Sequence, residues 1–297
     1  MARTQLTIKK ENNLAAAILT LPYLFFITIF VIVPVLYALR MSFFNWGFYS
    51  ESEFVGLSNF VLVIKDGKFA DSILVACKYA LFVVPTSMLF SFIIALLMHS
   101  FNGRISSLLK ISVYIPNVVS GVIASCIFVF IFDYMNGFAN VIMQALGRQP
   151  VAWLTTPGYA MAAIVIPTIW LGFGTTSLIL LSGLNDIPTV YYEAASLDGA
   201  GPIKQLIFIT LPSMKNVFGY VFITSCVGAL QALDLPMLLT GGGPLNTTTT
   251  PNLLIYQHFK SDIKMGYTVA ASMMLFSVVA LGSAVIFKFI KSEKSVE

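Results

Sequence analysis

Six charge-poor apolar runs, each long enough to cross a bilayer, constrain this chain more than any other feature of its sequence. They cover residues 14–39, 79–98, 111–132, 158–184, 216–236 and 265–287. A membrane-spanning helix needs about 20 consecutive apolar residues. Because lipid offers the backbone no hydrogen-bond partners, each run has to satisfy its own amide groups as a helix. The runs predict an all-α membrane protein with six transmembrane helices.

The composition supports the same class. Hydrophobic residues make up 58% of the chain and charged residues only 10%, whereas soluble domains carry about 25% charged residues. Such a chain cannot cover its surface with groups that water solvates. The fifth run is the weakest, because Gln231 and Asp234 fall near its end.

The distribution of positive charge predicts the orientation. The first run continues without a charge to Leu39, too long for the core of a cleaved signal peptide, so we expect it to be a retained span. With both termini inside, ten of the 17 Lys and Arg residues lie on the cytoplasmic side, a weak bias in the expected direction. We expect cytoplasmic tails at 1–13 and 291–297 around a transmembrane domain at 14–290.

A polar segment, residues 185–215, separates the fourth and fifth runs and falls on the cytoplasmic side. Asp186 and Pro188 are typical of a helix start. Gly199 is suited to end that helix, because glycine tolerates a positive φ. A second helix should follow and end before Pro212. The segment predicts two short helices that meet at a glycine corner.

The spacing inside this segment carries a resemblance. Glu193-Ala194-Ala195, then Gly199 after three residues, then Leu211-Pro212, matches the "EAA" loop of ABC importer permeases. The chain resembles permease subunits of binding-protein-dependent importers in the carbohydrate-uptake group, of the maltose and glycerol-phosphate type. The similarity runs from about residue 55 to 285 and includes FVGLSNF at 54–60, NGFANVIMQALG at 136–147, AWL at 152–154, LTGGGPLNTTT at 239–249 and GYTVAASMMLF at 266–276.

This resemblance implies a type I ABC importer permease fold with a core at about 72–285 and a cytoplasmic coupling helix between spans 4 and 5. It also implies that this helix contacts the ATPase. The contact residues would be Glu193, Ala194, Ala195, Asp198, Gly199, Leu211 and Pro212. An ordinary solvated loop is the alternative, and the full spacing disfavours it.

The chain lacks the means to hydrolyse ATP. It has no G-x-x-x-x-G-K-[ST] phosphate loop, and the glycines at 241–243 are followed by Pro244 and no lysine. No metal-ligand cluster or catalytic nucleophile is evident, because His99 and His258 are isolated. We therefore expect no enzyme activity and no cofactor in this chain, with ATP-Mg bound by two partner ATPase subunits.

The resemblance implies the other partners as well. They are a second homologous permease, an extracytoplasmic solute-binding protein, a sugar and membrane lipid, in the inner or plasma membrane of a prokaryotic cell. The net charge of +4 contains no basic tract for nucleic acid.

The spans are almost free of ionisable groups, which argues against a secondary carrier driven by protons or sodium. A neutral sugar needs hydrogen-bonding groups and aromatic faces. Each candidate has a structural alternative. The side chain of Asn117 could equally well form a hydrogen bond between helices, and packing is the favoured role for Trp170. A plain turn accounts equally well for the composition of the GGGP segment. Our candidates for the solute path are Asn117, Ser120, Trp170, Gln231, Asp234, Gly242, Gly243 and Pro244.

Two alternatives stay open. An importer of the same architecture could carry glycerol phosphate or a polyamine, although no strongly acidic span lining for a polyamine is visible. A secondary carrier would require the EAA spacing to be accidental.

Overall fold

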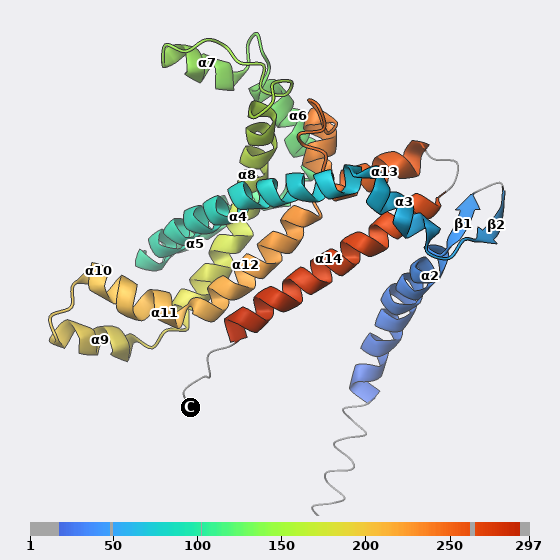
Figure 1. Cartoon of the computed structure of the whole chain (residues 1–297). Coiled ribbons are helices and arrows are strands. Elements are labelled where there is room, and N and C mark those ends of the chain that lie inside the picture. Colours follow the sequence, from blue (N-terminus) through green and yellow to red (C-terminus); the bar gives the residue numbers. More distant parts are fainter. Residues whose placement is uncertain (1–17, 48–49, 102, 262–264, 292–297) are drawn as a thin grey trace, which may run out of the picture. The chain divides into compact units, whose positions relative to one another are not determined.

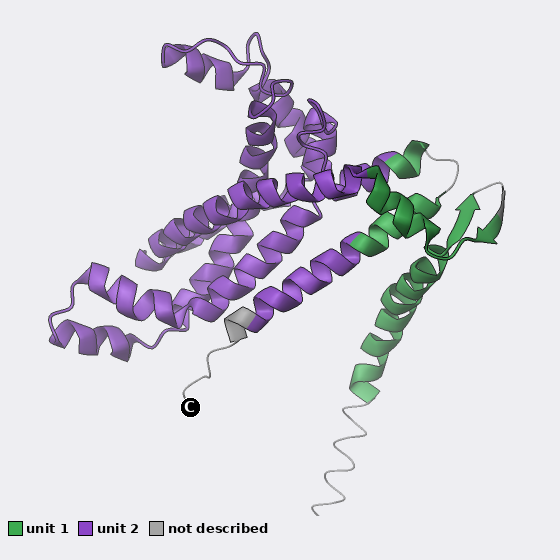
Figure 2. Cartoon of the chain, viewed as in Figure 1, with its two compact units in different colours: residues 1–66, 258–274 green, residues 67–257, 275–297 purple. Residues whose placement is uncertain are grey.

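The computed structural model describes residues 18–47, 50–101, 103–261 and 265–291, and most of them are helical (Figure 1). The chain divides into two compact units (Figure 2). Unit 1 comprises residues 1–66 and 258–274, and unit 2 comprises residues 67–257 and 275–297.

Unit 1 combines a long apolar helix with a small hairpin. The helix runs from Ile18 to Met41 and includes η1 (Thr28–Ile32) and α2 (Val33–Met41). Strands β1 (Phe44–Gly47) and β2 (Ser50–Phe54) then pair antiparallel, and α3 (Ser58–Asp66) follows. Phe44 and Phe54 face one another across the hairpin with ring centroids 5.3 Å apart.

A buried asparagine of the FVGLSNF segment holds unit 1 together. The side-chain amide of Asn59 is 4% exposed and donates to the carbonyl oxygens of Ser42 at 2.9 Å and Phe44 at 3.0 Å. A Cβ atom at Gly266, the first residue of α14 (Gly266–Lys291), would lie 2.5 Å from Asn59 Oδ1. Glycine at 266 therefore lets α14 begin directly against this amide.

Unit 2 is built on two long helices that pack along one another, α4 (Lys68–Ser100) and α8 (Tyr159–Asn185). Helices α5 and α12 pack against this pair. The other bounds in and around unit 2 are α5 (Arg104–Val118), α6 (Gly121–Ile131), α7 (Phe138–Ala145), α9 (Thr189–Leu197), α10 (Pro202–Gln205), η2 (Leu206–Thr210), α11 (Leu211–Ser213), α12 (Lys215–Leu230), η3 (Pro236–Thr240) and α13 (Pro251–Ser261).

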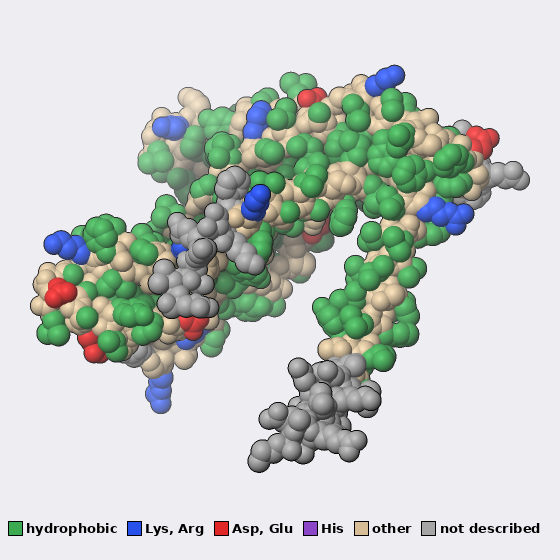
Figure 3. Space-filling view, turned by 60° about the horizontal axis from the view of Figure 1, so that its bottom comes forward, with side chains coloured by type: hydrophobic (Ala, Val, Ile, Leu, Met, Phe, Trp, Pro, Cys, Tyr) green, Lys and Arg blue, Asp and Glu red, His purple; other side chains and the backbone are tan. Residues whose placement is uncertain are grey.

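Small residues allow these helices to approach closely. A Cβ at Gly174 of α8 would lie 2.3 Å from the carbonyl oxygen of Val113 in α5, and Ala95 and Ala163 are fully buried. Close packing between small residues is the main attraction between helices in lipid, where burying apolar surface adds little. Large hydrophobic side chains instead cover most of the face seen in Figure 3, with few charged groups among them.

Four of the six predicted spans are confirmed as single helices of membrane-crossing length and composition. They are Ile18–Met41, Lys68–Ser100, Tyr159–Asn185 and Gly266–Lys288. The second begins eleven residues before the apolar run at 79, because its polar first turns continue the same helix. Residues 14–17 of the first predicted span lie outside the described residues.

The third predicted span, 111–132, is not one straight helix. Its two parts, α5 and α6, meet at 91°. Val119 and Ser120 between them are extended, and Ser120 Oγ accepts the backbone N–H of Ile123 at 3.3 Å to cap α6. A serine cap competes with the helical backbone for hydrogen bonds, which is why the apolar run does not stay continuous.

The fifth predicted span, 216–236, is shorter than expected, because α12 ends at Leu230. The helix that precedes it, Pro202–Ser213, is bent from α12 by 64° at a break of one residue. The described part of the chain contains four membrane-crossing helices, or up to six if each bent pair forms one span. The chain is a multi-pass membrane protein.

A second buried asparagine orders the segment between α6 and α8. Asn140 is 1% exposed, and its Nδ2 donates to the carbonyl oxygens of Asp133, Tyr134 and Val151 at 2.9–3.3 Å. Its Oδ1 accepts the backbone N–H of Val151 and the indole N–H of Trp153 at 2.9 and 3.0 Å. One amide thus ties α7 to both flanking loops.

Candidate functional site

The polar segment between α8 and α12 folds as a two-armed elbow, here defined as residues 186–213. Its first arm is α9 and its second arm is the continuous helix α10–η2–α11 (Figure 1). The predicted N-cap at Asp186 is two residues too early, because Pro188 is the N-cap of α9. Asp186 is the C-cap of α8, and α9 begins at Thr189 after Pro188. The long apolar helix continues to Asn185, and residues 186–188 form the short connection to α9.

The corner of the elbow is closed by a pair of hydrogen bonds around Gly199. The amide of Ala200 donates to the carbonyl of Ala195 at 2.9 Å, and the amide of Gly199 donates to that of Ser196 at 3.1 Å. This is the Schellman arrangement, which needs a left-handed residue at the turn. Gly199 supplies it with φ of 76°, as the sequence predicts.

Side chains hold the two arms together. The amide nitrogen of Gln205 donates to Ser196 Oγ at 2.9 Å and to the carbonyl of Ala200 at 3.1 Å. Further from the corner, the hydroxyls of Tyr192 and Thr210 are 2.9 Å apart. The elbow is therefore a fixed unit with bonds at both ends of its arms.

The outer surface of the elbow is apolar and exposed. Leu197 is 90% exposed, Ile203 74% and Phe208 75%. None of the residues of α9, α10 or α11 is buried. An exposed apolar patch of this kind on a protruding element marks an interaction surface.

The predicted coupling residues occupy different places in this elbow. Glu193, Ala194 and Asp198 are exposed on α9 and at its end, and Ala195 is half-buried. Leu211 and Pro212 are exposed within the second arm. The predicted helix boundary at Pro212 is wrong, since the arm continues through Ser213 and bends at Met214. Pro212 is the second residue of α11 and follows directly after the π-helical turn η2.

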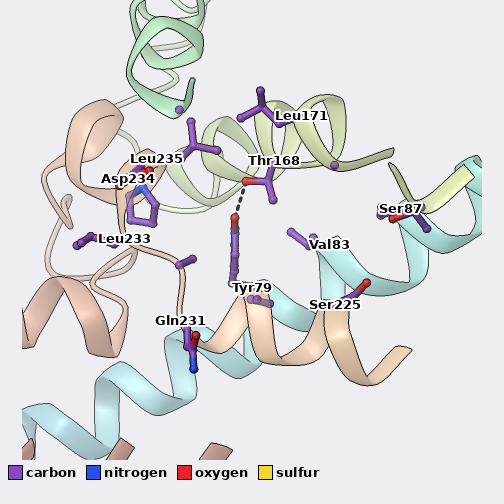
Figure 4. Close-up of a pocket in the computed structure, with 17 residues that line it drawn as sticks. Tyr79, Val83, Ser87, Thr168, Leu171, Ser225, Gln231, Leu233, Asp234 and Leu235 are labelled. Carbon is purple, nitrogen blue, oxygen red and sulfur yellow. Dashed lines mark hydrogen bonds between the residues drawn. The ribbon is translucent and has the colours of Figure 1, made fainter. Parts of the chain in front are cut away.

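A cavity of about 500 Å³ lies deeper in unit 2 (Figure 4). It is formed by α4, α8, α12, the start of α6 and the segment 231–236. The described residues that line it are Tyr79, Val83, Ser87, Gly121, Thr168, Leu171, Gly172, Thr176, Ser225, Gly228, Ala229, Gln231, Ala232, Leu233, Asp234, Leu235 and Pro236.

The cavity mixes apolar walls with hydroxyl groups, one side-chain amide and one carboxylate. Thr168 Oγ1 donates to the carbonyl of Ile164 at 2.7 Å. Since a threonine hydroxyl has one hydrogen, we infer that the Tyr79 hydroxyl donates to Thr168 Oγ1, the contact marked by the dashed line in Figure 4. The tyrosine oxygen keeps its lone pairs for a further donor. Asp234 is the one charged residue among the described residues of the lining.

The structure brings together two of the predicted path residues. Gln231 and Asp234 both line the cavity. Gly121 allows the side chain of Asp234 to lie against the start of α6, because a Cβ at position 121 would lie 3.0 Å from Asp234 Oδ2. Tyr79 and Thr168 were not predicted, although isolated hydroxyl groups within the second and fourth apolar runs are a signal that could have identified them.

Three other predicted path residues lie outside this lining. Trp170 packs edge-on against Phe128 with ring centroids 5.7 Å apart, as part of a hydrophobic core. Ser120 caps α6. Asn117 is exposed near the end of α5.

The other predicted path residues, Gly242, Gly243 and Pro244, do not line the cavity either. They form a turn that threonines hold from within: Thr249 Oγ1 donates to the carbonyl of Gly242 at 3.1 Å, and Thr248 Oγ1 to that of Gly243 at 2.8 Å. A Cβ at Gly242, where φ is 91°, would lie 2.4 Å from Thr249 Oγ1.

The same stretch anchors the wall of the cavity. Thr250 is fully buried, and its Oγ1 donates to the carbonyl of Ala232 at 2.6 Å. Asn252 Nδ2 donates to the carbonyl of Gln231 at 2.6 Å. The turn therefore positions the segment that carries Gln231 and Asp234. No group of three or more potential metal ligands occurs within the described ranges.

Comparisons with known proteins agree with this architecture. Residues 54–290 match the family model described as "Binding-protein-dependent transport system inner membrane component". The sulfoquinovosyl glycerol transport system permease protein SmoG of Agrobacterium fabrum is 30% identical over 95% of this chain and 92% of its own length. The trehalose/maltose transport system permease protein MalF of Thermococcus litoralis is 33% identical over 85% of this chain and 86% of its own.

The fold has a solved counterpart. A chain of a bacterial ABC transporter involved in the import of the acidic polysaccharide alginate superposes with a TM-score of 0.79 at 20% identity, covering 99% of this chain and 100% of that one. The likeness extends over the whole type I importer permease fold. The chain belongs to a family of membrane transport components, the binding-protein-dependent transport system inner membrane components.

Proposed function

We propose that this chain is one of two permease subunits of an ATP-driven importer for a sugar or oligosaccharide. A solute-binding protein delivers the sugar outside the cell, and two ATPase subunits bind ATP-Mg inside. Both termini and the elbow are cytoplasmic. The observation that carries the proposal is the elbow, which combines the EAA spacing with a locked glycine corner and an exposed apolar surface.

The elbow suits the transmission of force. Its two arms are tied by Gln205 and by the Tyr192–Thr210 pair, so a push on its surface moves it as one body. The first arm follows α8 and the second leads into α12, and both of these helices line the cavity. An ATPase that binds the elbow differently in its two states would thereby shift the cavity walls.

The names of the relatives support a sugar as solute. They include permeases for trehalose and maltose, for lactose and for arabinooligosaccharides. The cavity offers what a polyol recognises, an aromatic ring with hydroxyl, amide and carboxylate groups around it. Glycerol phosphate fits less well, since no Lys or Arg is among the described lining residues, and a polyamine would be served by more than one carboxylate.

The ATPase contact is tested by two matched valine substitutions. Gly199 has φ of 76°, where valine is strained, whereas Gly201 has φ of −73° and open space around it. The tagged chain with Gly199→Val should insert into the membrane but lose its copurifying ATPase, and Gly201→Val should retain it. Equal retention by both variants would contradict a docking role for the corner. Uptake of maltose, glycerol phosphate and spermidine by the assembled transporter separates the solute classes.

A further inference from the structure

A second cavity, of about 300 Å³, lies where α4 and α8 end and α5 begins. It is separate from the solute cavity and shares no lining residue with it. Its described lining residues are Met98, His99, Phe101, Gly103, Ser106, Ser107, Lys110, Leu181 and Asn185.

The polar groups of this cavity favour a negative ligand. Lys110 lines it, and no Asp or Glu is among its described lining residues. His99 Nδ1 lies 3.0 Å from Asn185 Oδ1. Because that oxygen can only accept, the imidazole N–H donates to it, and the amide nitrogen of Asn185 is left as a donor.

The serine hydroxyls add adaptable donors. Ser106 Oγ and Ser107 Oγ donate to backbone carbonyls at 3.4 and 3.3 Å. Bonds of that length are weak, so either hydroxyl can rotate toward a stronger acceptor. The positive end of α5, a helix of 15 residues that begins at Arg104, adds to the field of Lys110.

We propose that this cavity binds a phosphate group. A phosphate presents several acceptor oxygens to the ammonium, amide and hydroxyl donors gathered here. The volume is at the low end of small-ligand sites, about 300–1,000 Å³, and suits a phosphate with a short glycerol arm. That chemistry is shared by the headgroup of an anionic phospholipid and by a soluble phosphate ester.

The position of this cavity next to the elbow predicts an effect of the bound ligand. Leu181 and Asn185 belong to the last turns of α8, directly before the elbow. A phosphate held by α4, α5 and α8 together would fix the base of the elbow. This consequence rests on the proposed function, whereas binding to the cavity does not.

Native mass spectrometry of the purified full-length chain in detergent tests the binding. The probes are phosphatidylglycerol, neutral diacylglycerol, and sn-glycerol 3-phosphate with inorganic phosphate. Lys110→Gln should weaken retention about 10-fold, as loss of a charged hydrogen bond predicts, and Lys110→Arg should restore it. Lys288→Gln, an exposed lysine near the end of α14, should change nothing.

The choice of probes distinguishes a lipid headgroup from a soluble phosphate ester. Retention of phosphatidylglycerol but not of the soluble esters identifies a lipid site, and Lys110-dependent retention of the soluble esters identifies a metabolite site. His99→Gln provides a second variant should Lys110→Gln elute as aggregate in size exclusion. The proposal is overturned if diacylglycerol binds as well as phosphatidylglycerol, or if both variants retain every phosphate probe as the unsubstituted chain does. Such a result would leave the ATPase assay at Gly199 unaffected.

Discussion

Gln205 donates a hydrogen bond across the corner of the elbow to Ser196 Oγ at 2.9 Å, and so joins the second arm to the first. The same amide nitrogen reaches the carbonyl of Ala200 in the turn itself. Since no residue of α9, α10 or α11 is buried, these polar bonds contribute most of what holds the corner in shape. Rigidity at this place is what a force-transmitting element requires.

Gln205→Ala should loosen the corner without disturbing the spans. Loss of a hydrogen bond of this kind costs about 1 kcal/mol, so local opening should increase about 5-fold. Hydrogen exchange at the amides of residues 196–205 measures this directly. Lys204→Ala, a change at the adjacent exposed position, is the control. Unchanged hydrogen exchange in Gln205→Ala would mean that the backbone hydrogen bonds of the turn are enough to keep the corner closed.

Tyr79→Phe should reduce solute uptake while preserving the fold. The ring stays, and Thr168 still has the carbonyl of Ile164 as a partner, so stability should change little. Loss of one hydrogen bond to a sugar hydroxyl costs about 0.5–1.5 kcal/mol, a decrease of about 2- to 10-fold. Uptake of radiolabelled sugar by the assembled transporter measures it. Tyr220→Phe, at a 57% exposed position, should match the unsubstituted protein; a loss shared by both variants would exclude a specific role for Tyr79.

Asn140→Ala should destabilise unit 2 strongly. The substitution leaves the indole N–H of Trp153 and several carbonyls without their partner, and buried unsatisfied groups make the cost about 3 kcal/mol. Heating followed by size exclusion monitors the loss of folded protein. Asn136→Ala, four residues earlier and exposed, serves as the comparison. Equal melting temperatures of the two variants would contradict a stabilising role for the hydrogen bonds of Asn140.

Gly242→Ala and Gly241→Ala form a matched pair. Both glycines have a positive φ, but only Gly242 has an atom within 4 Å of the added Cβ, Thr249 Oγ1 at 2.4 Å. Backbone strain alone costs about 1–2 kcal/mol, and the clash at Gly242 adds about 1–3 kcal/mol. Thermal stability should therefore fall further for Gly242→Ala, and uptake with it, since this turn anchors the cavity wall. Equal effects would mean that the turn can open to admit the methyl group.

Features set by local chemistry could be predicted from the sequence. Gly199 ends α9 because few other residues adopt its φ, and four apolar runs form single helices because lipid leaves the backbone no alternative. The end of α8 was missed. Asp186 and Pro188 are typical of a helix start, yet the preceding helix, whose Leu184 packs in the hydrophobic core, runs to Asn185 and takes Asp186 as its C-cap.

The cavity depended on long-range packing and was only partly predictable. Gln231 and Asp234 stood out as polar groups beside an apolar run. Tyr79 and Thr168 come together across 89 positions of the chain, a relationship that no local pattern contains. The glycines of the GGGP segment indicate a turn, but no local pattern shows that threonines bond to its carbonyl groups and that it lies outside the cavity lining.

Uptake of labelled sugar into proteoliposomes tests the central claim most directly, that an external ATPase drives this chain through its elbow. The liposomes contain either the chain alone or the chain with its permease and ATPase partners, supplied with binding protein. The account predicts accumulation only in the complete assembly with ATP-Mg, and its loss in Gly199→Val. Accumulation by the chain alone in the absence of nucleotide would contradict it.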